Sequence, residues 1–295
     1  MPDIPNADDV RVNFFVLIAD SVLYGLVLLL FVSDVYFLAT RRTLAGNTRS
    51  RKHHLMSLVF LGVTALFILI TAHWTVIVYR GYLAFIQLGN VTSEISFYSN
   101  DTSQPTEVAS VSLFFLIILL GDMLLDYRLW IIWGGHRKVM ILPVLTVVGA
   151  VVASVGVVFH FAGWVSQSNT WSGLGFGFSL INNIYSTGFI AFRMSTAKCS
   201  PESRLTSFLT ILIESAALQT FWLTFTGIAV LLGSLLEPFA ADIFPAIIGI
   251  ANLLIHARVG LGWSQDTAAR VTVKQKVTRE IEIKEDLGCV SVELN

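Results

Sequence analysis

The residues with the clearest chemical potential are acidic, amide, histidine and arginine side chains that interrupt long apolar runs. Ionisable groups are costly in the hydrocarbon of a bilayer, so each one within such a run is a candidate for function. Two of them, Asp20 and His73, form a predicted outer polar layer that we expect to bind a small ligand. A larger inner polar layer, which we expect to act as a switch or relay, comprises Asp34, Asp122, Asp126, Arg128, Glu214, Asn252 and His256.

Helical spacing places some of these side chains on common faces. Asp122 and Asp126 are four residues apart, which puts them on one face of a helix. Asp20 and Asp34 are fourteen residues apart, so they share a face to within about 40° and lie at two depths. Asp20 with His73 is then either a proton-linked pair, part of an outer pocket, or ordinary packing.

The residues of the inner polar layer also have purely structural interpretations. Asp126 and Arg128 form either an ion pair or snorkelling contact at the membrane border, or a switch. Asp34 is either functional or a helix-end residue that reaches the lipid headgroups. Asp122 and Glu214 either belong to a functional network or make the hydrogen bonds between helices that set their packing. The sequence leaves these alternatives open.

Several catalytic and cofactor chemistries lack their residue patterns. The six histidines are scattered, and no pair shows the His-Glu-x-x-His spacing of a zinc site. There is no Gly-x-Ser-x-Gly nucleophile elbow and no phosphate-binding glycine loop. No lysine lies within an apolar run, so the chain cannot hold retinal as a Schiff base. We therefore predict no enzyme activity, no metal site and no cofactor.

The composition sets the class of protein. Of 295 residues, 55% are hydrophobic and 13% are charged, against about 25% charged in soluble domains. This balance excludes a soluble globular enzyme and a disordered chain. A membrane-spanning helix needs about 20 mostly apolar residues. Seven such runs are present, near 14–38, 55–79, 108–130, 139–162, 174–192, 208–232 and 239–257.

These runs predict an all-α polytopic membrane protein, a bundle of seven transmembrane helices over 14–258. We expect a short extracellular segment at 1–13 and a mostly disordered cytoplasmic tail at 259–295. The runs at 174–192 and 239–257 are the weakest, because both contain polar residues. The polar stripe of the run at 174–192, which we interpret as packing contacts between helices, consists of Ser179, Asn182, Asn183 and Ser186.

The distribution of charge predicts how the bundle faces. Of 19 lysines and arginines, only Arg11 and Arg80 fall in the segments on one side of the predicted spans. Cytoplasmic loops carry the excess of such residues, so the N-terminus is expected outside and the tail inside. Two glycosylation sequons, at Asn90 and Asn100, both lie in the loop expected outside. The sequence therefore also predicts a glycoprotein.

Parts of the chain resemble a large group of seven-helix membrane proteins of mushroom-forming (basidiomycete) fungi. The resembling segments are Gly121-Asp122, Tyr127-Arg128, Trp130-Ile131-Ile132-Trp133, Ile213-Glu214-Ser215-Ala216-Ala217-Leu218 and Arg258-Val259-Gly260-Leu261-Gly262. The layout, with the N-terminus out and the tail in, is similar to that of G-protein-coupled receptors. The resemblance implies a seven-helix fold and a fungal source, whereas the group has no established activity to carry over.

Three functions fit these observations. The first is a receptor-like sensor of a small extracellular ligand, coupled to a heterotrimeric G protein or another cytoplasmic partner. The second is a proton- or cation-linked transporter or channel that uses the acidic inner polar layer. The third is a non-catalytic membrane organiser that holds anionic lipids or partner tails on its basic loops. We expect the plasma membrane as location, the lipid bilayer as surroundings and no nucleic-acid partner.

Overall fold

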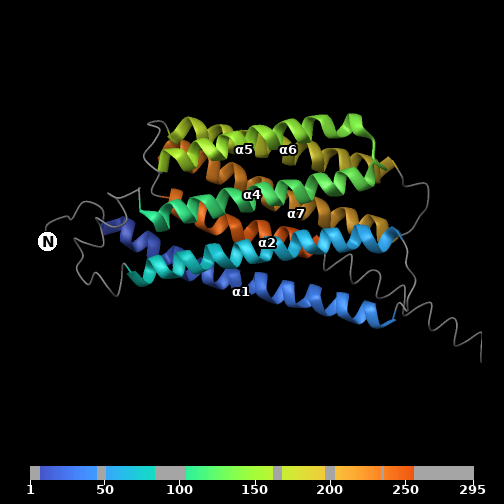
Figure 1. Ribbon diagram of the computed structural model, residues 1–295, viewed down its shortest axis with the longest axis horizontal. Coiled ribbons are helices and arrows are strands. Elements are labelled where there is room, and N and C mark those ends of the chain that lie inside the picture. The colour runs from blue at the N-terminus through green and yellow to red at the C-terminus, as the bar shows by residue number, and fades with distance from the viewer. Residues whose placement is uncertain are drawn as a thin grey trace, which may run out of the picture.

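The fold is a bundle of long helices that run along a common axis (Figure 1). The computed structural model describes residues 7–44, 51–83, 104–161, 168–196, 203–233 and 236–255. Within these residues there is no strand. The helices are α1 (Ala7–Leu44), α2 (Arg51–Tyr82), α4 (Pro105–Ile132), the short 3-10 helix η2 (Arg137–Met140), α5 (Ile141–Phe161), α6 (Ser168–Thr196), α7 (Ser203–Leu232) and a last helix, here called the 237–255 helix (Glu237–Ile255).

Six stretches of the described chain are long and apolar enough to cross a bilayer. They are Phe14–Phe37, Val59–Tyr82, Pro105–Ile132, Arg137–Phe161, Ile213–Leu232 and Glu237–Ile255. Each overlaps one of the predicted apolar runs, so the prediction of an all-α membrane protein is confirmed. The remaining predicted run, 174–192, lies within α6, which is a continuous helix of 29 residues but is less apolar than the other six. The sequons at Asn90 and Asn100, His256 and the tail lie outside the described residues.

The surface of the bundle is apolar over much of the length of its helices. Large hydrophobic side chains are exposed on α1 and α5, with Leu29 at 66% and Leu145 at 62% exposure as examples. In water such a surface would mark a binding site or a tendency to aggregate. On helices of this length it is the surface that lipid chains solvate, which agrees with the composition.

The 237–255 helix and α4 form the interior of the bundle. The 237–255 helix is the most buried of the six apolar stretches, and α4 is the next. Glycines let the neighbours approach closely: a methyl group on Gly249 would lie 2.6 Å from Ile70 of α2, and one on Gly121 of α4 would lie 2.9 Å from Ile248. Close approach through small residues is typical of helix packing in membranes.

The other helices are arranged around this pair. The helix α4 packs against α2, α5 and α6, and α6 packs in turn against α5 and α7. The helix α1 contacts α2 and lies at one edge of the bundle, opposite α5 and α6 (Figure 1). As a result, α4 contacts α2 on one side of the bundle and α5 and α6 on the other.

A tight turn joins α4 to α5. Gly134 and Gly135 have φ values of 62° and 83°, a backbone conformation that glycine adopts without a steric penalty. Just before them, the Trp133 indole donates a hydrogen bond to the carbonyl oxygen of Phe189 on α6 at 3.2 Å. The guanidinium carbon of Arg193 lies 5.5 Å from the centre of the same Trp133 ring. The turn therefore fixes this end of α4 against α6.

The close packing of α5 on α6 predicts a specific sensitivity. In Gly156→Ala the new methyl group would lie 2.5 Å from a ring carbon of Trp171, so the indole must move. We expect a loss of about 1–3 kcal/mol in unfolding free energy, as for other overpacked cores. Thermal unfolding of the purified full chain in detergent measures it.

The control for this prediction is Gly177→Ala on α6, where an added methyl group meets nothing within 4 Å. Its unfolding midpoint should equal that of the unaltered protein or exceed it slightly, because alanine favours helix more than glycine does. Equal midpoints for the two variants would contradict the packing described here.

Candidate functional site

Two hydrogen bonds between buried side chains join α4 to α6. Ser179 Oγ donates to Asp122 Oδ2 at 2.7 Å, and Ser186 Oγ donates to Asp126 Oδ1 at 2.9 Å. All four residues are buried. The acceptors are four residues apart on α4 and the donors seven apart on α6, so each set occupies one helix face. Because both sets follow the same order along their helices, α4 and α6 are parallel at this contact.

The polar stripe of α6 extends these contacts to two more helices. Asn182 Oδ1 accepts a hydrogen bond from Thr146 Oγ1 of α5 at 3.2 Å. Asn183 Oδ1 accepts one from Thr220 Oγ1 of α7 at 2.9 Å. Thus α6, the least apolar of the long helices, turns its polar side chains toward α4, α5 and α7. We call these four interhelical hydrogen bonds the polar seam.

Arg128 does not join the polar seam. Its Nη2 donates to the backbone oxygen of Asn252 on the 237–255 helix at 3.5 Å, and its charge lies within electrostatic range of Asp34 on α1. Among the described residues Arg128 forms no ion pair with Asp126, because residues two apart point about 200° apart around a helix. Asp34 is buried, with 8% exposure, so it does not extend to the headgroups.

Two further residues of the predicted inner polar layer, Asn252 and Glu214, differ in burial. Asn252 is buried, and its Nδ2 donates to the carbonyl oxygen of Ile248 at 2.9 Å. Glu214 lies on the exposed face of α7, one residue before the buried Ser215, so the structure does not bring it together with Asp122. The reason is rotation: successive residues differ by about 100° around a helix.

A small cavity lies beside Arg128, between α4, α6, α7 and the 237–255 helix. The volume of the cavity is about 10 Å³, which is room for about one water molecule. It is lined by Leu125, Arg128, Asn183, Thr187, Ser215, Ala216, Gln219, Asn252 and Ile255. Six of these nine lining residues are polar or charged, although they belong to mostly apolar helices.

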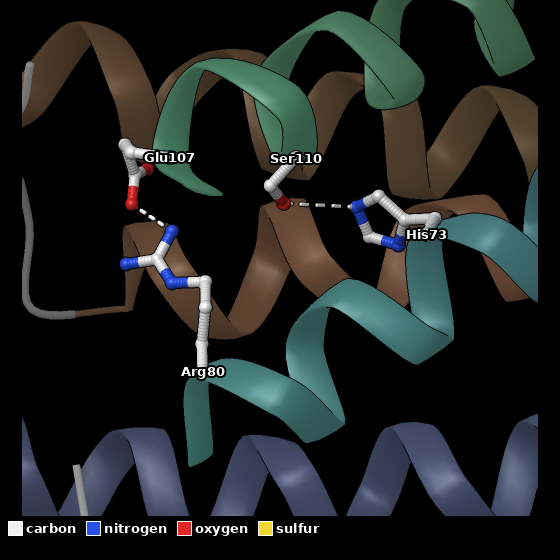
Figure 2. A network of polar contacts seen from close by, with 4 residues as sticks. All are labelled: His73, Arg80, Glu107 and Ser110. Atoms are coloured by element: carbon white, nitrogen blue, oxygen red, sulfur yellow. Dashed lines mark hydrogen bonds and ion pairs between the residues drawn. The ribbon is translucent and has the colours of Figure 1, made fainter. Parts of the chain in front are cut away.

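A second group of contacts surrounds His73 of the predicted outer polar layer and joins α2 to α4 (Figure 2). His73 Nε2 and Ser110 Oγ are hydrogen-bonded at 3.4 Å, and Arg80 forms an ion pair with Glu107. In Figure 2 both side chains of α2 reach toward α4, which begins at this end of the bundle. The two contacts therefore tie the start of α4 to the end of α2.

Asp20 approaches this group from α1. It is 3% exposed, and its Oδ2 has no hydrogen-bond partner in the described part of the chain. Asp242 of the 237–255 helix lies within electrostatic range of both Asp20 and Arg80. Among the described residues Asp20 and His73 do not hydrogen-bond to each other, so the predicted proton-linked pair is not formed directly.

Some residues of the site escaped the sequence analysis. They are uncharged hydroxyl and amide residues, a kind that is common in membrane helices and does not by itself indicate a site: Ser110, Thr146, Gln219 and Thr220. A signal was present on α7, where Ser215, Gln219 and Thr226 recur at helical spacing and are all buried.

No family model, curated protein or solved structure matches this chain. The resemblance to the fungal seven-helix proteins therefore stays a prediction. What the protein does has to be inferred from the polar seam, the cavity and the outer polar layer.

The polar seam predicts that Ser179→Ala is destabilising. The Oδ1 of Asp122 has no hydrogen-bond partner in the segments that the structure describes, and Ser179 supplies the hydrogen bond to its other oxygen. Removal of that donor leaves a buried carboxyl group unsatisfied, which costs about 1–3 kcal/mol. Unfolding of the purified variant in detergent measures the loss.

Ser154→Ala on α5 is the matched control. Ser154 is also buried, but its hydroxyl donates at 2.7 Å to the carbonyl oxygen of Ala150 within its own helix. That carbonyl also accepts the ordinary helical bond, so no group is left unsatisfied. If Ser154→Ala loses as much unfolding free energy as Ser179→Ala, the hydrogen bond between helices contributes no more to stability than one within a helix.

Proposed function

We propose that the chain crosses the membrane seven times, with its N-terminus outside and its tail in the cytoplasm. The contacts of α6 support this topology, because its polar residues are buried against other helices and its outward residues, such as Ile181 and Ile184, are apolar. A parallel α4 and α6 with α5 between them is also what seven crossings require. The bias of lysine and arginine supports the orientation.

Within this topology, the protein is a receptor-like sensor of a small extracellular ligand. The observation that carries the proposal is that α4 belongs to both polar layers. Ser110 near its start bonds to His73, and Arg128 near its end bonds to Asn252. They are 18 positions apart, which is about 27 Å of helix and close to the hydrocarbon thickness of a bilayer.

A shift of α4 therefore changes side-chain contacts at both of its ends. A ligand that changes the contacts at Ser110 or Glu107 moves the start of α4. The same movement alters the geometry of the polar seam and of the Arg128 contact at the other end. A ligand shifts such an equilibrium only through a difference in affinity for the two arrangements, and the outer polar layer is where that difference arises.

The ligand site is assigned to the space near Asp20, His73 and Asp242. Asp20 presents a buried oxygen that lacks a hydrogen-bond partner among the residues described, and unsatisfied buried polar atoms mark sites of function or strain. The transport alternative is weaker, because Glu214 faces outward and does not extend a polar path from Asp122. The plasma membrane remains the proposed location, with a cytoplasmic partner that contacts the inner end of the bundle.

The test is affinity purification of the tagged protein from its native membranes, probed for heterotrimeric G-protein subunits with and without a non-hydrolysable GTP analogue. We expect subunits to be enriched and the analogue to release them. Arg128→Gln should raise the enrichment about fivefold, since loss of one hydrogen bond of about 1 kcal/mol frees the inner end of α4.

Arg193→Gln is the control for that substitution. Arg193 contacts the Trp133 ring at the same end of the bundle and takes no part in the network around Arg128. It should leave the enrichment unchanged. A lack of G-protein subunits in a well-folded preparation of the unaltered protein would contradict the coupling to this partner.

A further inference from the structure

The cavity beside Arg128 has a donor-rich lining. Asn183 is 1% exposed and lines the cavity, and its Nδ2 has no hydrogen-bond partner among the described residues. The orientation of this amide is set by its oxygen, which accepts hydrogen bonds from Thr220 at 2.9 Å and from Thr187 at 3.5 Å. The nitrogen that remains is a buried donor without an acceptor, a costly arrangement in a membrane interior.

Arg128 adds a charged donor to the same cavity. A guanidinium carries five N–H groups, and within the described part of the chain Arg128 makes one hydrogen bond, at 3.5 Å, to the backbone oxygen of Asn252. Asp34 lies within electrostatic range of Arg128 but is not in ion-pair contact with it. The carboxylate therefore balances part of the charge and leaves guanidinium N–H groups available to an acceptor.

The size of the cavity narrows the choice of acceptor. The space holds about one water molecule, so phosphate and larger carboxylates do not fit. A cation is disfavoured by the guanidinium and by the amide donor. A monatomic anion accepts several N–H bonds at once, and charge-assisted bonds of this kind are stronger than those to water.

We propose that this cavity binds a single chloride ion between Arg128 and Asn183. The ion connects Arg128 of α4 to Asn183 of α6, whose side-chain oxygen already takes part in the polar seam. It satisfies the buried amide of Asn183 and stabilises the arrangement in which Arg128 contacts the 237–255 helix. This binding does not depend on the receptor function proposed above, because it requires only the cavity and its donors.

The test is thermal unfolding of the purified full chain in detergent at increasing chloride, with sodium gluconate keeping ionic strength constant. Gluconate is too large for the cavity. The midpoint should rise with chloride and then follow the logarithm of its concentration. At ten times the dissociation constant, binding should lower the unfolding equilibrium constant about elevenfold. Bromide should replace chloride.

Asn183→Asp is the sharpest variant, because it keeps the oxygen that accepts from Thr220 and replaces the unpaired donor with an acceptor. It should abolish the chloride effect. Asn182→Asp is the matched control: it makes the same change one residue earlier, on a side chain that bonds to Thr146 and does not line the cavity. It should keep the chloride effect, whatever its own stability.

If Asn183→Asp does not fold, Arg128→Gln and equilibrium dialysis of the unaltered protein with radioactive chloride replace it. We expect one chloride bound per chain, and none in Arg128→Gln. Equal midpoints in chloride and gluconate for the unaltered protein would overturn the proposal and leave the cavity to water. A chloride effect that persists in both Asn183→Asp and Arg128→Gln would also overturn it, because the ion would then bind elsewhere.

Discussion

The structure depends on one constraint: a polar side chain in hydrocarbon has no water to bond to and must find its partner within the bundle. The helix α6 is less apolar than the six stretches that are long and apolar enough to cross a bilayer. Its polar side chains find partners within the bundle: Ser179 and Ser186 bond to the carboxylates of α4, while Asn182 and Asn183 bond to α5 and α7. The same bonds set the rotation of α6 and its register against α4.

The constraint is met incompletely, and the exceptions include residues of the two polar layers and of the polar seam. Buried atoms without partners in the described part of the chain include carboxylate oxygens of Asp20, Asp34 and Asp122 and the amide nitrogens of Asn182 and Asn183. A fully satisfied network would hold one arrangement firmly, whereas a partly satisfied one leaves room for a ligand, an ion or a second arrangement. Incomplete pairing at both ends of α4 is the physical basis of the switch proposed for this protein.

Much of the fold could be predicted from the sequence, because the length of an apolar run reports a membrane helix directly. The rotation of each helix could not. Lipid is as apolar as the interior of the bundle, so α4 and α7 show no apolar stripe that separates the buried face from the lipid face. The sequence analysis grouped Glu214 with Asp122 because both are predicted at the same depth in the membrane, whereas Glu214 lies on the exposed face of α7. The spacing of Asp122 and Asp126 does predict a shared face of α4, and both accept hydrogen bonds from α6.

The central claim is that the polar seam keeps α6 in the membrane as one of seven crossings. The most direct test is the sidedness of the two termini, with different tags at each end of the full chain and antibodies applied to intact and then permeabilised cells. Seven crossings place the termini on opposite sides, so the N-terminal tag should be stained in intact cells and the C-terminal tag only after permeabilisation. Both tags on the same side would require an even number of crossings and would contradict the claim.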